Sequence, residues 1–139
     1  MKQNHPVIVI DDDEDDRFLI REGLQKAGCN KEIIQFENGR EFLRFLQGIP
    51  KNEHPSIIML DLNMPVMDGK EVLKELKGNA RFRQIPVIIY STSNISMDRE
   101  YAITNGANCY ISKPGTFDEL VDIMKSISML WCFDSSVIS

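Results

Sequence analysis

The feature of this sequence that most constrains its fold is a regular alternation between short strand-like runs and longer segments with helical periodicity. The five strand-like runs lie at residues 7–10, 32–36, 56–60, 87–90 and 109–112. The first run is continuously apolar and β-branched, which is typical of a strand buried on both faces. A helical segment follows each run, and this strict alternation favours a parallel sheet covered by helices on both sides. We therefore predict an α/β fold with a doubly wound, five-stranded parallel sheet.

The helical segments carry their own start and stop signals. Asn38 and Thr116 are predicted to cap the second and fifth helices, and Ser96 or Asp98 is predicted to start the fourth. The first helix is predicted to end at Gly28 and to turn four apolar side chains toward the core. These side chains are Phe18, Leu19, Leu24 and Ala27.

Reactive side chains follow four of the five strands, at the point where each strand ends. Asp11 and Asp12 follow the first strand, Asp61 follows the third and Lys113 follows the fifth. A cluster of hydroxyl residues follows the fourth strand, and its members are Ser91, Thr92 and Ser93. Ligands of open α/β sheets bind at the carboxyl ends of the strands, so we expect these side chains to converge at one edge.

Three carboxylates held close together favour a divalent cation, because like charges resist joint ionisation. Mg²⁺ prefers carboxylate oxygens and water, and it often binds phosphate oxygens as well. A carboxylate oxygen of Asp61 would then attack a phosphoryl group and form an acyl phosphate. Lys113 and the hydroxyl of Ser91 are expected to hold the phosphoryl oxygens, since phosphoryl transfer depends mainly on positioning and charge neutralisation.

Length and charge agree with one local acidic site on one globular domain. The chain has 139 residues and a net charge of −5. Residues 11–16 are all acidic, and without them the acidic and basic residues would nearly balance. No basic footprint indicates nucleic acid, and no apolar run is long enough for a membrane span or a signal peptide, so we expect a cytoplasmic protein. The three cysteines have no zinc-site or disulfide spacing.

Two other chemistries fit parts of the same pattern. A phosphohydrolase similar to haloacid dehalogenases would use Asp11 as nucleophile and Asp13 as acid, but it leaves Asp61 without a role. A calcium loop would take its ligands from residues 11, 13, 15 and 22, but it requires glycine where Asp16 stands. Taken singly, each strand-end residue is also an ordinary helix cap or loop residue. Their joint position at successive strand ends favours the phosphoryl site.

With these residues in place, the chain resembles response-regulator receiver domains of two-component signalling over about residues 5–130. The matching pieces are the acidic pair after the first strand, the segments 60–69 and 106–114, and the hydroxyl at Ser91. The resemblance implies a flavodoxin-like (βα)5 fold with strand order 2-1-3-4-5. It implies a receiver domain over residues 1–130 and a short tail over 131–139 with no output domain. Long segments at 48–54 and 79–84 are similar to those of small phytochrome-associated response regulators.

The resemblance also implies how the site residues share the chemistry. Asp61 is the phosphoacceptor, and Mg²⁺ is bound by Asp12, Asp61 and the carbonyl of Asn63. Asp11 contributes to the metal mainly through water. Lys113 and the hydroxyl of Ser91 contact the phosphoryl group.

A residue beside the site is expected to report its state. Tyr110 matches the aromatic switch residue of the family, which turns inward when the hydroxyl moves toward the phosphate. Thr92 follows Ser91 directly, so a shift of one residue in the contacting hydroxyl stays open. The peptide bond between Lys113 and Pro114 is often cis in the family.

The resemblance implies partners rather than an enzymatic turnover of its own. The phosphodonor is expected to be a sensor histidine kinase or a histidine phosphotransfer protein, and the receiver promotes only its own phosphotransfer and dephosphorylation. The downstream target is a protein that the sequence does not identify, with no nucleic acid or membrane involved. A homodimer through the fourth helix, fifth strand and fifth helix is a further expectation. A degenerate receiver that acts only as a binding module stays an alternative.

Overall fold

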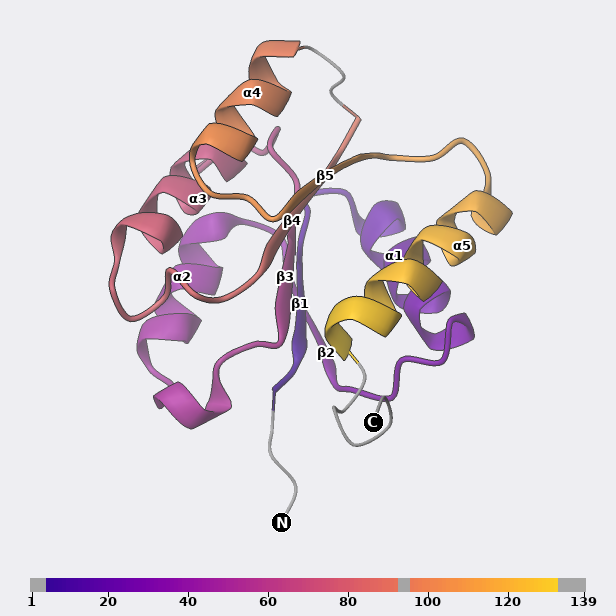
Figure 1. The fold of residues 1–139 in the computed structure, drawn as a ribbon, viewed down its shortest axis with the longest axis horizontal. Coiled ribbons are helices and arrows are strands. Elements are labelled where there is room, and N and C mark those ends of the chain that lie inside the picture. Colours follow the sequence, from indigo (N-terminus) through magenta and orange to yellow (C-terminus); the bar gives the residue numbers. More distant parts are fainter. Residues whose placement is uncertain (1–4, 93–95, 133–139) are drawn as a thin grey trace.

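All five predicted strands form, and they lie side by side in a single sheet. The computed structural model describes residues 5–92 and 96–132, and Figure 1 shows the sheet edge-on with helices on both sides. The strands are β1 (Val7–Ile10), β2 (Ile33–Phe36), β3 (Ile57–Leu60), β4 (Val87–Ser91) and β5 (Cys109–Ser112). They pair in parallel in the order β2-β1-β3-β4-β5, which confirms the predicted sheet and strand order.

Five α-helices cover the two faces of the sheet. They are α1 (Glu14–Lys26), α2 (Gly39–Gln47), α3 (Gly69–Gly78), α4 (Ser96–Thr104) and α5 (Phe117–Ile127). A short 3₁₀ helix, η1 (Lys51–Glu53), precedes β3, and a π-helical turn, η2 (Ser128–Cys132), continues α5. Helices α2, α3 and α4 lie on one face, and α1 and α5 lie on the other (Figure 1). None of the helices over residues 5–92 and 96–132 is long and apolar enough to cross a membrane.

Two separate cores explain why the strands are continuously apolar. In β1, Ile8 and Ile10 pack under α2, α3 and α4, whereas Val7 and Val9 pack under α1 and α5. Successive side chains of a strand point to opposite faces, so a strand between two helical layers needs an apolar residue at every position. All four residues of β1 are at most 1% exposed.

The predicted core face of α1 was wrong for its first turns. Phe18 and Leu19 are 58% and 40% exposed, whereas Ile20 and Leu24 are buried. Gly23 explains the difference, because a Cβ atom there would lie 3.2 Å from atoms of two α5 side chains, Leu120 and Met124. The buried face of α1 therefore runs through a residue that carries no hydrophobic side chain.

The helix starts follow the predicted caps. Asn38 accepts a hydrogen bond from the N–H of Glu41 at 2.9 Å, and Thr116 accepts one from the N–H of Glu119 at 3.2 Å. Helix α4 begins at Ser96, the first of the two predicted starts. Such caps satisfy backbone donors that the first turn leaves unpaired. The predicted tail from residue 133 onward lies outside the described residues.

Candidate functional site

The strand-end carboxylates meet at the carboxyl edge of the sheet, as predicted. Asp11 follows β1 and Asp61 follows β3, and these two strands are neighbours. The N–H of Asp61 donates to the carbonyl of Ile10 at 3.0 Å, which holds the two chain ends together. Carboxylate oxygens of Asp11, Asp12 and Asp61 all lie within 4.8 Å of one another. A cluster of carboxylate oxygens this close together is the kind of ligand set that a hard divalent cation binds.

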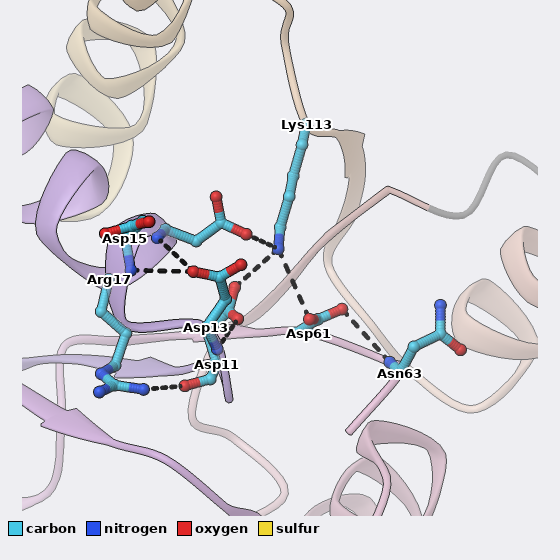
Figure 2. Close-up of polar contacts among 8 residues, drawn as sticks. Asp11, Asp13, Asp15, Arg17, Asp61, Asn63 and Lys113 are labelled. Carbon is cyan, nitrogen blue, oxygen red and sulfur yellow. Dashed lines mark hydrogen bonds and ion pairs between the residues drawn. The ribbon is translucent and has the colours of Figure 1, made fainter. Parts of the chain in front are cut away.

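Lys113 reaches into this group from the end of β5. Figure 2 shows its ammonium between Asp11 and Asp61. The Nζ atom lies 2.7 Å from Oδ2 of Asp11 and 3.5 Å from Oδ2 of Asp61. A third carboxylate, Asp16, also lies 2.7 Å from Nζ. Burial by itself lowers the pKa of Lys113, but the hydrogen bonds that its ammonium donates to Asp11 and Asp16 outweigh burial, so the pKa is raised and the ammonium stays charged.

The three clustered carboxylates of Asp11, Asp12 and Asp61 differ in their surroundings. Asp11 is 1% exposed, and its Oδ1 atom accepts a hydrogen bond from the N–H of Asp13 at 2.9 Å. Burial raises the pKa of Asp11 to about 6, although the ammonium of Lys113 acts in the opposite direction. Asp61 is 6% exposed, whereas Asp12 is exposed to solvent. Arg17 donates to the carbonyl of Asp11 at 2.6 Å and fixes the backbone there (Figure 2).

The loop after β3 turns sharply around Asp61. The N–H of Asn63 donates to Oδ1 of Asp61 at 3.2 Å, and the side chain of Asn63 is exposed. Gly69, at the start of α3, donates its N–H to the carbonyl of Leu62 at 2.9 Å. Between them, Val66 has a φ of +71°, a conformation that β-branched residues rarely adopt.

The ends of β4 and β5 are linked beside the site. The N–H of Lys113 donates to the carbonyl of Ser91 at 2.9 Å. Ser91 is fully buried and Thr92 is exposed, while Ser93 lies outside the described residues. Tyr110 is partly buried, and the guanidinium of Arg99 lies 5.3 Å from the centre of its ring. Ser91, the hydroxyl residue of the predicted switch, therefore lies beside Lys113 across the sheet. Tyr110, its aromatic residue, lies on β5, the strand that Lys113 follows.

One expectation for this edge does not hold, and the two alternative chemistries lose support. The residues that the structure describes contain no cis peptide bond, so the bond between Lys113 and Pro114 is trans. The calcium-loop alternative, already disfavoured by Asp16 in place of glycine, is excluded because α1 begins at Glu14 and places Asp15 on a helix instead of a loop. The phosphohydrolase alternative also loses support. The Oδ1 atom of its proposed acid, Asp13, accepts from the N–H groups of residues 15 and 16 and caps α1.

Asp16 is the site residue that the sequence did not identify. Acidic residues in a first helical turn usually complement the helix dipole, so the sequence around Asp16 indicates no more than that role. The sequence does contain one indication of a place in the site, because Asp16 follows the end of the first strand by only a few residues. Helix α1 begins at Glu14, only a short loop after β1 ends at Ile10, and so directs the side chains of its first turn back toward the edge of the sheet.

Comparison with known proteins agrees with this geometry. The model of the response regulator receiver domain matches residues 7–125. The chain belongs to the response regulator receiver family. The receiver is 31% identical over 128 residues to response regulator Rcp1 of Synechocystis sp., a match that covers 90% of this chain and 87% of that protein. It is also 31% identical over 120 residues to the polar-differentiation response regulator DivK of Brucella ovis, covering 86% and 93% of the two chains.

Solved structures show the same fold for the receiver. The phosphorylated cyanobacterial phytochrome response regulator RcpA superimposes with a TM-score of 0.83 at 31% identity, covering 92% of this chain and 94% of that one. The Mn²⁺-bound form of Rcp1 gives a TM-score of 0.81 at 30% identity, with the same coverage. The receiver is therefore a two-component response regulator module with relatives in the phytochrome-associated subgroup.

Proposed function

We propose that the receiver is a Mg²⁺-dependent phosphoacceptor switch and that Asp61 is the residue that becomes phosphorylated. The observation that carries this proposal is the buried carboxylate of Asp61 between two further carboxylates and the ammonium of Lys113. The phosphodonor would be a phosphohistidine on a sensor histidine kinase or a histidine phosphotransfer protein. Because its relatives include phytochrome response regulators, a phytochrome-type kinase is the donor to test first.

The residues present fit a magnesium ion. Asp12 and Asp61 would bind it directly together with the carbonyl of Asn63, and Asp11 would act mainly through water. When bound, Mg²⁺ neutralises negative charge on the carboxylates and on the phosphoryl oxygens. The Mn²⁺-bound form of a relative supports a divalent cation in this family. In this chain, the separation of at most 4.8 Å between carboxylate oxygens of Asp11, Asp12 and Asp61 also supports a divalent cation.

The transfer step would run in line through Asp61. One carboxylate oxygen attacks phosphorus, and the bond from phosphorus to the donor imidazole nitrogen breaks with its electron pair left on that nitrogen. The product is an acyl phosphate on Asp61 and a free histidine on the donor. Lys113 and the hydroxyl of Ser91 would hold the phosphoryl oxygens, with Thr92 as the alternative hydroxyl.

Signalling would follow through protein contacts. Tyr110 would turn inward once the hydroxyl of Ser91 moves toward the phosphoryl group, and α4, β5 and α5 would present the changed surface to a target protein or a second copy. The receiver would not turn over an external substrate, since the phosphoryl group ends on its own side chain. We place this activity in the cytoplasm, where histidine kinases expose their phosphorylated domains.

Intact mass spectrometry after incubation with acetyl phosphate and Mg²⁺ tests the proposal. We expect a single phosphoryl addition that disappears in Asp61→Asn and in the absence of Mg²⁺. Steady release of inorganic phosphate that is insensitive to Asp61→Asn would instead favour hydrolysis at Asp11. Neither addition nor release would favour a degenerate receiver that acts as a binding module.

A further inference from the structure

Lys113 forms an ion pair with Asp16, a residue outside the cluster of carboxylates proposed to bind the metal. Asp16, on the first turn of α1, lies 2.7 Å from Nζ of Lys113, whereas Asp61 lies 3.5 Å from the same atom. The side chain of Asp16 is 31% exposed and that of Lys113 is 10% exposed. Among the described residues, the carboxylates that group as a metal site are those of residues 11, 12 and 61. Asp16 therefore binds the lysine from outside that site.

An aromatic ring reinforces this position of the lysine. The centre of the Tyr90 ring lies 5.9 Å from Nζ of Lys113, and Tyr90 is 5% exposed. The electron-rich face of a buried ring attracts an ammonium at this distance. Asp16, Tyr90 and Lys113 also line one small cleft of about 120 Å³ between α1 and the segment that leads into α5. Two independent contacts thus keep the ammonium on the α1 side of the site.

We propose that Asp16 is a positioning residue that competes with the phosphoryl group for the ammonium of Lys113. This inference rests on the proposed function of Asp61 as phosphoacceptor. Asp16 would weaken the hold of the site on a phosphoryl group, and it would thereby favour the unphosphorylated state of the receiver.

The donor capacity of the ammonium explains the competition. An ammonium has three N–H donors, and two of them are directed at carboxylate oxygens of Asp11 and Asp16 at 2.7 Å. A metal ion bound at the acidic cluster would neutralise part of the charge of Asp11, and the ion pair between Asp11 and Lys113 would weaken. The contact with Asp16 would persist, because Asp16 stands outside that group. Asp16 would then be the main competitor for the donor that a phosphoryl oxygen needs.

Beryllofluoride, which mimics a phosphoryl group on a carboxylate, provides the test. Its affinity would be measured by calorimetry at saturating Mg²⁺ for the wild type, Asp16→Asn and Asp15→Asn. Asp15→Asn is the matched control because this substitution removes the same charge from the same helical turn. The N–H of Asp15 donates to Asp13, and the ion pairs of Lys113 described above do not include Asp15. Thermal unfolding of each variant checks that it is folded. An Asp16→Ser variant provides a second substitution in case Asp16→Asn does not fold.

We expect Asp16→Asn to raise beryllofluoride affinity about three- to fivefold, the upper part of the range for an exposed ion pair. Asp15→Asn should stay within about twofold of the wild type, and the Mg²⁺ affinity of both variants should change equally. The same gain in Asp16→Asn and Asp15→Asn, or a lower affinity in Asp16→Asn, would overturn the role of Asp16 and leave the phosphoacceptor intact. A wild type that does not bind beryllofluoride would overturn both.

Discussion

Gly69 lies directly against the backbone of Asp61. A Cβ atom on Gly69 would overlap the carbonyl oxygen of Asp61 and would come within 2.6 Å of the Cα atom of Leu62. Backbone atoms cannot move aside as the end of a flexible side chain can. Helix α3 can therefore begin this close to the proposed phosphoacceptor only with glycine at its first position.

Replacing Gly69 with alanine should therefore damage both stability and the site. We expect Gly69→Ala to lower the free energy of unfolding by about 3 kcal/mol, because the added methyl must displace the β3 end. Urea denaturation measures this change. Gly78→Ala is the control: no atom lies within 4 Å of a Cβ at Gly78, so this variant should be about 0.5 kcal/mol more stable than the wild type. Equal effects of the two substitutions would contradict the close approach.

The loop between Asp61 and α3 stores backbone strain at Val66. This residue has a φ of +71° and is 70% exposed. Asparagine tolerates that conformation far better than a β-branched residue, so Val66→Asn should stabilise the receiver by about 1 kcal/mol in urea denaturation. Val66→Thr keeps the branching and only replaces one methyl group with a hydroxyl, so its stability should match the wild type. A gain of the same size in both variants would show that exposure, not strain, is the cause.

Mg²⁺ binding should weaken as the pH falls through 6. Burial raises the pKa of Asp11 to about 6 in the metal-free receiver, so below that pH the carboxyl carries a proton that metal binding must displace. At pH 5 we expect the apparent affinity to be about tenfold lower than at pH 7, as measured by calorimetry. Asp11→Asn should bind Mg²⁺ more weakly, with a flatter dependence over this range. An equally steep dependence in Asp11→Asn would assign the titration to another group.

His54 should make the receiver less stable in mild acid. The residue is 7% exposed, its ring centre lies 5.5 Å from that of Phe82, and its buried Nε2 atom has no hydrogen-bond partner among the described residues. Burial lowers the pKa of His54 from its ordinary value of 6.5, and the charges of Arg81, Lys51 and His5 act in the same direction. Below pH 6.5 the unfolded chain therefore binds a proton that the folded chain does not, and the free energy of unfolding falls as the pH decreases.

His54→Leu isolates this contribution. The difference in unfolding free energy between the wild type and this variant should shift in favour of the variant between pH 7 and pH 5. Taking the difference removes the contribution of Asp11, which has the opposite sign because its raised pKa favours the folded state as the pH decreases. A difference that is independent of pH would show that His54 titrates normally.

The sheet and most of its carboxyl edge were predictable from the sequence because they depend on local patterns. Continuous apolar runs identify buried strands, and the end of each run identifies the residues that follow it. That rule predicts from the sequence alone that Asp11, Asp61 and Lys113 lie at this edge. The caps at Asn38 and Thr116 were predictable for the same reason, since a cap bonds to a residue only three positions away.

The features that the sequence missed depend on tertiary contacts. The buried face of α1 passes through Gly23, which has no hydrophobic signal and is buried only because α5 packs there. The partner of Asp16 is Lys113, 97 positions along the chain, so the first helical turn alone suggests only a dipole interaction. The conformation of Val66 is likewise set by the turn around Asp61 and contradicts the preference of the residue itself.

The hydrogen bond from the N–H of Lys113 to the carbonyl of Ser91 has a mechanical consequence. It extends the pairing of β4 with β5 to the last residues before the site, so the main chains that carry the amine and the hydroxyl form one rigid unit. Neither group can approach an occupied Asp61 by sliding its strand. If Asp61 is phosphorylated as proposed, the amine and the hydroxyl would therefore reach it by rotation of their own side chains, and restricting those rotations would block the response without unfolding the receiver.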